Sequence, residues 1–184
     1  MEGDQRSVLD HLEEEDQMVF WAEGFRYQFK HAVNRTMLTG ASRLAILTAP
    51  PSSRELRDAL DQVLPKEVFL FSLESPSDSV KDFLADVQKF IRVKLQGREV
   101  MISLSSMAAM LGQTIEVAFK GLQWYQLRGQ LEVSRINDQV RIKRIKANIS
   151  PDIEAFTIDL MNLLKETAAF RNYYLRADPA VLLG

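Results

Sequence analysis

Residues 103–144 read SLSSMAAMLGQTIEVAFKGLQWYQLRGQLEVSRINDQVRIKR, and this stretch decides the fold of the second half of the chain. Ser103 and Thr114 are each suited to cap a helix, because a hydroxyl oxygen can accept a hydrogen bond from a free backbone N–H. Gly112 and Gly129 follow apolar runs, where a glycine commonly ends a helix in the left-handed conformation. The pattern predicts two helices, one over 104–111 and one that starts after Thr114 and ends at Gly129.

A β-hairpin is predicted next, with strands over 131–134 and 139–143 joined through Asn137-Asp138. Alternation in the second strand places Val140 and Ile142 on one face, and Arg141 and Lys143 on the other. Helix, glycine turn, helix and hairpin is the order of a winged helix-turn-helix. We set its bounds at 97–147, with the helix that ends near Leu95 as the first helix of the motif.

The region before it alternates strands with helices. Three apolar runs predict buried strands, at 18–22, 43–48 and 68–71. Helical periodicity predicts helices over 27–38, from Ser52 or Ser53 to Pro65, and from Ser77 to Leu95. Continuous apolar strands separated by helices favour a parallel sheet covered on both faces. We therefore predict a small three-layer α/β subdomain over 17–96, with three strands at most.

The two ends of the chain complete the predicted organisation. Residues 1–16 are acidic and are expected to form an arm or a helix. Residues 148–184 are predicted to be a C-terminal helix, from Pro151 to Leu175, followed by a tail. The predicted fold class is thus α/β, with a small parallel-sheet subdomain, a winged helix-turn-helix and a C-terminal helix.

Composition excludes several classes of protein. Apolar residues make up 46% and charged residues 26% of the 184 residues, as is typical of globular proteins. The absence of cysteine excludes disulfides, cysteine zinc sites and iron–sulfur clusters, and with two histidines we expect no metal and no cofactor. No apolar run approaches the roughly 18–20 residues of a membrane span. We expect a cytoplasmic protein with no membrane partner.

Catalytic groups are tested by elimination. Neither His11 nor His31 lies at a strand end or turn where it could activate a serine. No glycine-rich phosphate loop follows a strand, and the loop over 48–53 is interpreted as a rigid turn. Paired carboxylates occur only in the acidic run 13–16, which is typical of a solvated surface. We therefore expect a chain without catalytic residues.

Charge is unevenly distributed along the chain. The whole sequence has a net charge of −2, yet residues 89–146 hold eleven basic residues against four acidic ones. A basic segment indicates a nucleic-acid surface, and the alternative is a solvated face. On the second helix of the motif the outward positions would be Gln113, Glu116, Lys120 and Gln123, of which Glu116 would repel phosphate. The candidate nucleic-acid-binding residues are Lys120, Arg128, Arg135, Arg141, Lys143, Arg144 and Lys146.

Several stretches resemble the C-terminal accessory region of RecJ-type single-stranded-DNA exonucleases. They are LAILTAPP at 44–51 with the following Glu55-Leu56-Arg57, VFLF at 68–71, the helix pair from Ser103 to Trp124, and ETAAFRNYY at 166–174. Together they cover residues 43–176. Such nucleases cleave DNA from the 5′ end with divalent metals held by an Asp-His-His motif, which this chain lacks, and the family's OB barrel is not evident. The resemblance implies a non-catalytic piece of a metal-dependent exonuclease that acts in DNA repair and recombination.

The expected partners are therefore single-stranded or junction DNA, bound without sequence specificity, and a nuclease core or repair protein. Two alternatives stay open. One is a free-standing winged-helix transcription regulator, which would read spaced half-sites through a specific helix face. The other is a purely structural protein-interaction domain, which is the default if no DNA binding is found.

Overall fold

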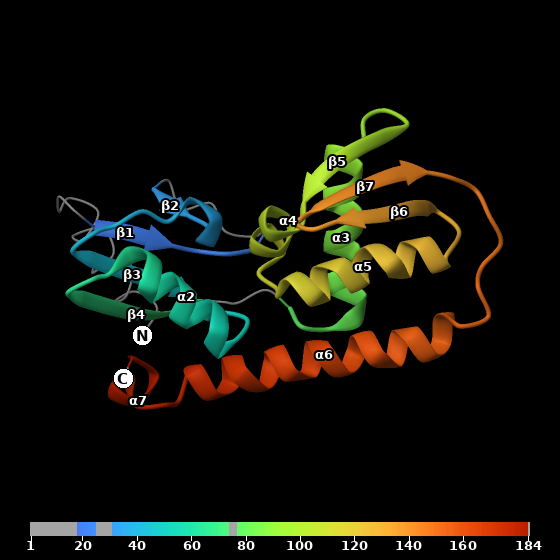
Figure 1. The fold of residues 1–184 in the computed structure, drawn as a ribbon. Helices are drawn as coiled ribbons and strands as arrows, with labels where there is room; N and C mark the ends of the chain where they lie inside the picture. Colours follow the sequence, from blue (N-terminus) through green and yellow to red (C-terminus); the bar gives the residue numbers. More distant parts are fainter. Residues whose placement is uncertain (1–17, 25–30, 74–76, 184) are drawn as a thin grey trace.

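The computed structural model describes residues 18–24, 31–73 and 77–183, which form a mixed α/β fold (Figure 1). The described residues contain a four-stranded parallel sheet, a three-stranded antiparallel sheet and six α-helices. The acidic arm predicted at 1–16 lies outside these ranges. The two sheets belong to separate units, which a long C-terminal helix joins.

The parallel sheet has the order β2-β1-β3-β4. Its strands are β1 (Met18–Trp21), β2 (Ala32–Val33), β3 (Arg43–Thr48) and β4 (Glu67–Leu73), and every neighbouring pair is parallel. The three predicted strands and their parallel arrangement are confirmed. We call this sheet, with its helix α2 (Ser53–Val63) and the 3₁₀ turn η1 (Arg35–Met37), the parallel-sheet unit.

The second strand in the chain, β2, corrects the prediction of a helix over 27–38 and of three strands at most. Ala32 and Val33 pair with Phe20 and Trp21 of β1, so pairing at the sheet edge overrides the helical spacing of the apolar residues. Asn34 then accepts a hydrogen bond from the Thr36 N–H and starts only the short turn η1. The described part of 27–38 therefore contains a strand and a 3₁₀ turn.

Helix α2 covers one face of the parallel sheet. Ser52 caps its start, as predicted, and Leu64 ends it in the left-handed conformation just before Pro65. Its buried residues pack on a core that includes Trp21, Leu44 and Ile46. The opposite face holds a cluster around Phe20, Ala45, Leu47 and Phe71, to which no described helix contributes. Three layers were predicted from the sequence, but the described residues form only two, the sheet and the helical layer on one of its faces.

The remaining elements form what we call the helical unit. In chain order they are α3 (Val80–Lys94), β5 (Glu99–Ser103), α4 (Leu104–Leu111), α5 (Ile115–Leu127), β6 (Leu131–Ile136) and β7 (Gln139–Arg144). The strands form an antiparallel sheet in the order β5-β7-β6. Ser103 and Thr114 cap α4 and α5, and Gly112 ends α4 with a φ of 62°, as predicted. Strand β5 was not predicted.

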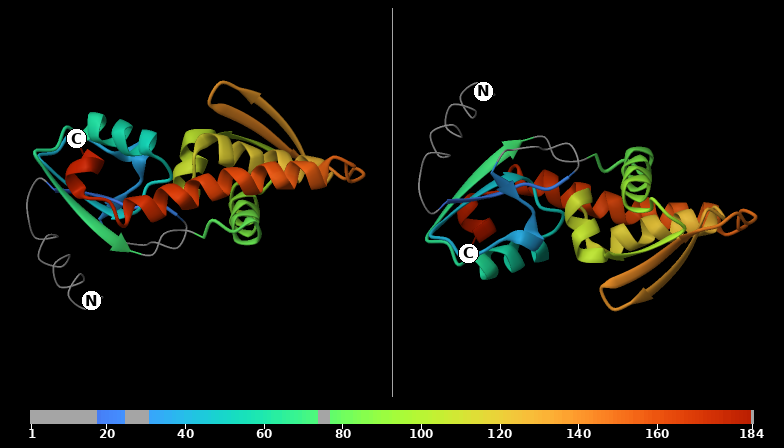
Figure 2. Two further views of the ribbon diagram at one scale, coloured as in Figure 1. Left: turned by 90° about the horizontal axis from the view of Figure 1, so that it is seen from below. Right: turned by 90° about the horizontal axis from the view of Figure 1, so that it is seen from above.

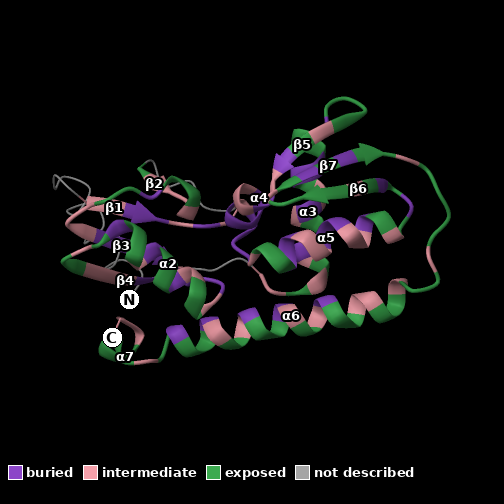
Figure 3. Cartoon of the chain, in the orientation of Figure 1, coloured by how far each residue is buried: buried purple, intermediate pink, exposed green. Residues whose placement is uncertain are grey.

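The core of the helical unit is made by three helices packed against the inner face of its sheet. Residues of α3, α4 and α5 share this core with Val140 and Ile142 of β7. Helix α3 crosses α5 at Gly121, where an added Cβ would lie 2.9 Å from Phe83 and from Val87. The hairpin of β6 and β7 is largely exposed on its other side (Figure 3).

Helix α6 (Ile153–Tyr174) runs along both units and leads into the short α7 (Pro179–Leu183) (Figure 2). Leu160 and Leu164 of α6 belong to the core of the helical unit, and Tyr174 belongs to the core of the parallel-sheet unit. The helix begins two residues after the predicted Pro151, and Asp152 precedes it without a side-chain cap. Among the described residues, no helix combines the length and apolar character needed to cross a bilayer.

Candidate functional site

The seven cationic residues predicted to bind nucleic acid do not form one continuous patch. Lys120 lies on α5 and faces α6. Its Nζ is 3.7 Å from Asp159 Oδ2 and 4.8 Å from the centre of the Phe156 ring, and its side chain is 23% exposed. Lys120 is therefore engaged by α6 rather than presented to a ligand.

Two of the arginines lie over aromatic rings of α5. The guanidinium of Arg128 is 5.1 Å from the centre of the Trp124 ring, and that of Arg135 is 5.0 Å from the centre of the Phe119 ring. Arg135 Nε also donates a hydrogen bond to the carbonyl of Asn137, at 2.8 Å. A stacked guanidinium keeps its charge and its outer N–H groups, so both residues remain able to contact an anion.

The outer face of the antiparallel sheet carries the alternation predicted for Arg141 and Lys143. Both side chains are exposed, whereas Val140 and Ile142 are buried. The register places Lys143 between Glu99 of β5 and Glu132 of β6, and its Nζ lies 3.5 Å from Glu132 Oε2. The positive charge of Lys143 is therefore largely offset, while Arg141 has no ion-pair partner among the described residues.

The last two predicted cations, Arg144 and Lys146, border a small cleft near the carboxyl end of α5. This end of α5 points away from the parallel-sheet unit (Figure 1). We call this cleft the cationic cleft, and its volume is about 370 Å³. A third basic residue, Arg92 of α3, lines it as well. Arg92 belongs to the basic segment 89–146 but was not among the predicted binding residues, and its place in the last turn of α3 is also one that suits the negative end of the helix dipole.

The predicted outward residues differ in how far they are buried: Glu116 of α5 is exposed, Lys120 and Gln123 are half-buried, and Gln113 lies in the turn before the helix. Gln113, predicted to face outward, is fully buried, and its Nε2 donates to Asp78 Oδ1 at 2.8 Å. Farther along the helix, Trp124 Nε1 donates to Thr157 Oγ1 of α6 at 2.9 Å. Helix α6 therefore packs along one side of α5.

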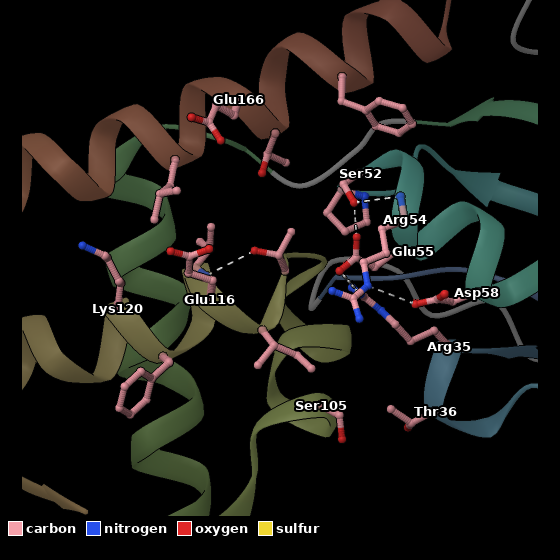
Figure 4. A pocket seen from close by; sticks show the side chains of 18 of the residues that line it. Arg35, Thr36, Ser52, Arg54, Glu55, Asp58, Ser105, Glu116, Lys120 and Glu166 are labelled. Atoms are coloured by element: carbon pink, nitrogen blue, oxygen red, sulfur yellow. Dashed lines mark hydrogen bonds and ion pairs between the residues drawn. The ribbon is translucent and has the colours of Figure 1, made fainter. Parts of the chain in front are cut away.

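Between α2, the start of α5, and α6 runs a larger groove of about 850 Å³, which we call the long groove (Figure 4). The outward α5 residues Glu116, Lys120 and Gln123 line it. Its charges are balanced, since four basic and four acidic side chains contribute to its wall; they are Arg35, Arg54, Lys120, Arg135, Glu55, Asp58, Glu116 and Glu166. This groove offers an anion no net attraction.

The carboxyl end of the parallel sheet, where open α/β sheets commonly bind ligands, is occupied by the helical unit. Glu23 follows β1 and accepts hydrogen bonds from Trp21 Nε1 at 2.9 Å and from Arg35 Nε at 2.7 Å. Arg35 also donates to the carbonyl of Gln113, at 2.8 Å, in the turn between α4 and α5. This polar cluster ties the two units together.

Arg171 of α6 completes the junction and is only 4% exposed. Its guanidinium donates to the carbonyl of Ala49 at 3.3 Å, to the carboxylate of Asp78 and to the carbonyl of Gly112. Burial lowers the pKa of Arg171 below its ordinary value, and the neighbouring Asp78 counteracts this shift. The charged groups of the junction are therefore paired, while the buried Gln113 Oε1 beside them has no hydrogen-bond partner.

Within the part of the chain that the structure describes, no group of three or more His, Asp or Glu side chains is placed to hold a metal ion. The structure thus brings Arg144 and Lys146 together, leaves Arg141 exposed, and engages Lys120 and Lys143 with carboxylates. Comparisons with models of protein families, with curated proteins and with solved structures found no match to this chain.

Proposed function

We propose that this chain is a non-catalytic nucleic-acid-binding module whose helical unit is a winged helix. The order helix, strand, helix, helix and hairpin around a three-stranded antiparallel sheet supports this interpretation. The hairpin of β6 and β7 would then be the wing. In keeping with the resemblance described above, the module is an accessory part of a RecJ-like 5′–3′ exonuclease that acts on single-stranded DNA in repair and recombination.

The observation that carries the proposal is where the free cations lie. Arg92, Arg144 and Lys146 gather at one cleft and, within the described ranges, none of them forms an ion pair. Helix α5, in contrast, is packed against α6. Phosphate contacts give affinity without sequence information, whereas base contacts require a helix or strand inside a groove. The arrangement therefore favours binding to the nucleic-acid backbone.

The direct test is DNA binding as a function of salt concentration. Fluorescence anisotropy would follow labelled single-stranded, junction and duplex oligonucleotides, each in two unrelated sequences, between about 50 and 200 mM salt. We expect binding to single-stranded or junction DNA, with equal affinity for both sequences and a logarithmic salt slope of about −0.7 for each phosphate that the chain contacts on a single strand. Absence of binding at about 50 mM salt would refute the proposal, and strong sequence selectivity for duplex DNA would support a regulator instead.

A protein-interaction domain is the second candidate, and the long groove is the observation that favours it. The groove has apolar residues in its wall, including Ile115 of α5, which is 37% exposed. Its balanced charges suit a mixed polar and apolar protein surface better than a polyanion. A chain that binds no oligonucleotide at low salt would leave this candidate as the better one.

A further inference from the structure

The cationic cleft has a composition that sets it apart from the rest of the surface. Its polar lining comes from α3, from the carboxyl end of α5, from the residue before β6, and from the end of β7 with the segment after it. These residues are Gln88, Arg92, Tyr125, Gln130, Arg144 and Lys146. No carboxylate is among the residues that line it, whereas the long groove has four. A concave site with three positive charges and no negative one attracts an anion.

The wall that carries Arg144 and Lys146 is held by backbone hydrogen bonds. The Arg144 N–H donates to the carbonyl of Arg98 at 3.0 Å, and the Ile145 N–H donates to that of Gln130 at 3.1 Å. The Ala147 N–H donates to the carbonyl of Gly129 at 2.9 Å. Gly129 has a φ of 69°, and a Cβ there would lie 2.2 Å from the Ala147 carbonyl oxygen, so the approach of the two chains requires glycine. The basic side chains therefore project from a fixed backbone.

Tyr125, which lines the cleft, lies within the electrostatic influence of two arginines. Burial raises the pKa of the Tyr125 hydroxyl, while Arg128 and Arg92 each act in the opposite direction. Both guanidinium groups are thus close enough to influence this side chain from opposite elements, α5 and α3. The hydroxyl itself donates to the carbonyl of Leu84 at 2.8 Å, so the ring is fixed in the wall of the cleft.

The chemistry of the cleft fits a phosphate group. Two guanidinium groups and one ammonium supply the charge-assisted donors that phosphate oxygens accept, and the amides of Gln88 and Gln130 can add neutral donors. The apolar side chains of Ile91 and Leu131 lie beside them and can contact a sugar ring. A volume of about 370 Å³ is larger than a phosphate ion alone needs, and leaves room for the nucleoside attached to it.

We infer that the cationic cleft seats one phosphate of a nucleic-acid strand, with Arg92 of α3 as a phosphate ligand together with Arg144 and Lys146. This inference rests on the proposed function and makes it specific, because it names the chemical group that the cleft binds and the side chains that hold it. Arg141 and Lys143, on the outer face of the hairpin, then contribute less than the residues of the cleft.

The test compares single variants in which a basic residue is replaced by glutamine, either inside the cleft or far from it. Arg92→Gln and Lys146→Gln each remove one cation from the cleft, and Arg57→Gln removes an exposed cation from α2, far from it. We expect each cleft variant to weaken binding to single-stranded DNA by about five- to tenfold and to make the salt slope shallower by at most about 0.7, the value for one phosphate, while Arg57→Gln matches the wild type. Thermal unfolding of each variant checks that the fold is retained.

The outcomes separate this inference from the proposed function. If the wild type binds DNA and the cleft variants bind equally well, the inference is wrong and the proposed function stands. If the wild type binds no DNA, the proposed function fails, and the cleft is tested by NMR titration with inorganic phosphate and with a nucleoside monophosphate. Amide shifts at 129–131 and 144–147 that Arg92→Gln abolishes would support a phosphate site, and an unchanged spectrum at millimolar ligand would overturn it.

Discussion

The buried guanidinium group of Arg171 donates to three acceptors, so we expect its loss to reduce the stability of the fold more than the loss of any other polar side chain. Its substitution would leave Asp78 charged and without its cation in a poorly solvated junction. Removing one partner of a buried pair is typically worth about 3–5 kcal/mol, so we expect Arg171→Met to lower the free energy of unfolding by about 3 kcal/mol in urea denaturation. The free energy of unfolding of Arg171→Lys should lie between those of the wild type and of Arg171→Met, because an ammonium group cannot reach all three acceptors that the planar guanidinium reaches.

The control for this prediction is Arg176→Met, at an exposed position just after the same helix. A surface substitution without structural partners should change the free energy of unfolding by less than about 0.5 kcal/mol. Equal stability of Arg171→Met and Arg176→Met would show that the junction contributes nothing.

The role of Arg171 could not be found from the sequence, because its partners lie far away along the chain. Asp78 is 93 residues from it and the Ala49 carbonyl 122 residues. Periodicity places Arg171 near the end of a helix, where a cation suits the dipole, and gives no sign of burial. Gln113 was misplaced for the same reason: its position follows from contact with Asp78, which no local pattern contains.

At the scale of elements, Asp138 joins the hairpin turn to the start of α4. Its carboxylate accepts hydrogen bonds from Ser103 Oγ at 2.7 Å, from the Ser105 N–H at 2.9 Å and from Ser105 Oγ at 3.0 Å. Burial acts to raise the pKa of Asp138, but these hydrogen bonds and the nearby Arg135 together lower it below the ordinary value of 3.8. The folded state therefore favours the charged form.

A carboxylate with a lowered pKa stabilises the fold above its ordinary pKa, and this contribution is lost as the pH falls through the lowered value. We expect Asp138→Asn to reduce the free energy of unfolding by about 1–2 kcal/mol at pH 7, and by progressively less as the pH falls below the ordinary carboxyl pKa. Urea titrations of both proteins at pH 7 and at lower pH values measure the difference. A cost that does not change with pH would mean that the charge of Asp138 is irrelevant.

The elements that were predicted correctly are those whose signals are local. Strand β3 and helix α4 have the bounds that the sequence indicated, since each has a clear apolar run and a stop signal next to it. The two strands that were missed are held by distant or edge pairing. Strand β2 has two residues at the edge of its sheet, and β5 pairs with β7, about 40 residues later. Each of these two strands has too few apolar residues to be recognised from the sequence pattern alone.

At the scale of the whole molecule, the important unpredicted feature is where α6 lies. Its apolar stripe was evident in the sequence, but a stripe does not say which surface covers it. The structure packs it along α5 and into the parallel-sheet unit, so one side of α5 is covered within the chain, while Glu116, Lys120 and Gln123 line the long groove. The cationic cleft, which α6 leaves uncovered, is lined by residues of α3, of β7 and of the segment after β7. These parts are distant in the sequence and come together only in the fold.

This arrangement predicts that the two units unfold together, and the only two tryptophans of the chain can report on it. Trp21 is buried in the parallel sheet, and Trp124 lies on α5 with its indole N–H on α6. Trp124→Phe and Trp21→Phe variants each leave one fluorescent probe, and we expect each probe to report the same urea midpoint as the circular dichroism of that variant, as a two-state transition requires. Adding Arg171→Met should move the Trp21 transition to lower urea than the Trp124 transition, because it breaks the junction while the core of the helical unit keeps its own contacts. Probes that disagree before Arg171 is changed would show that α6 does not couple the two units.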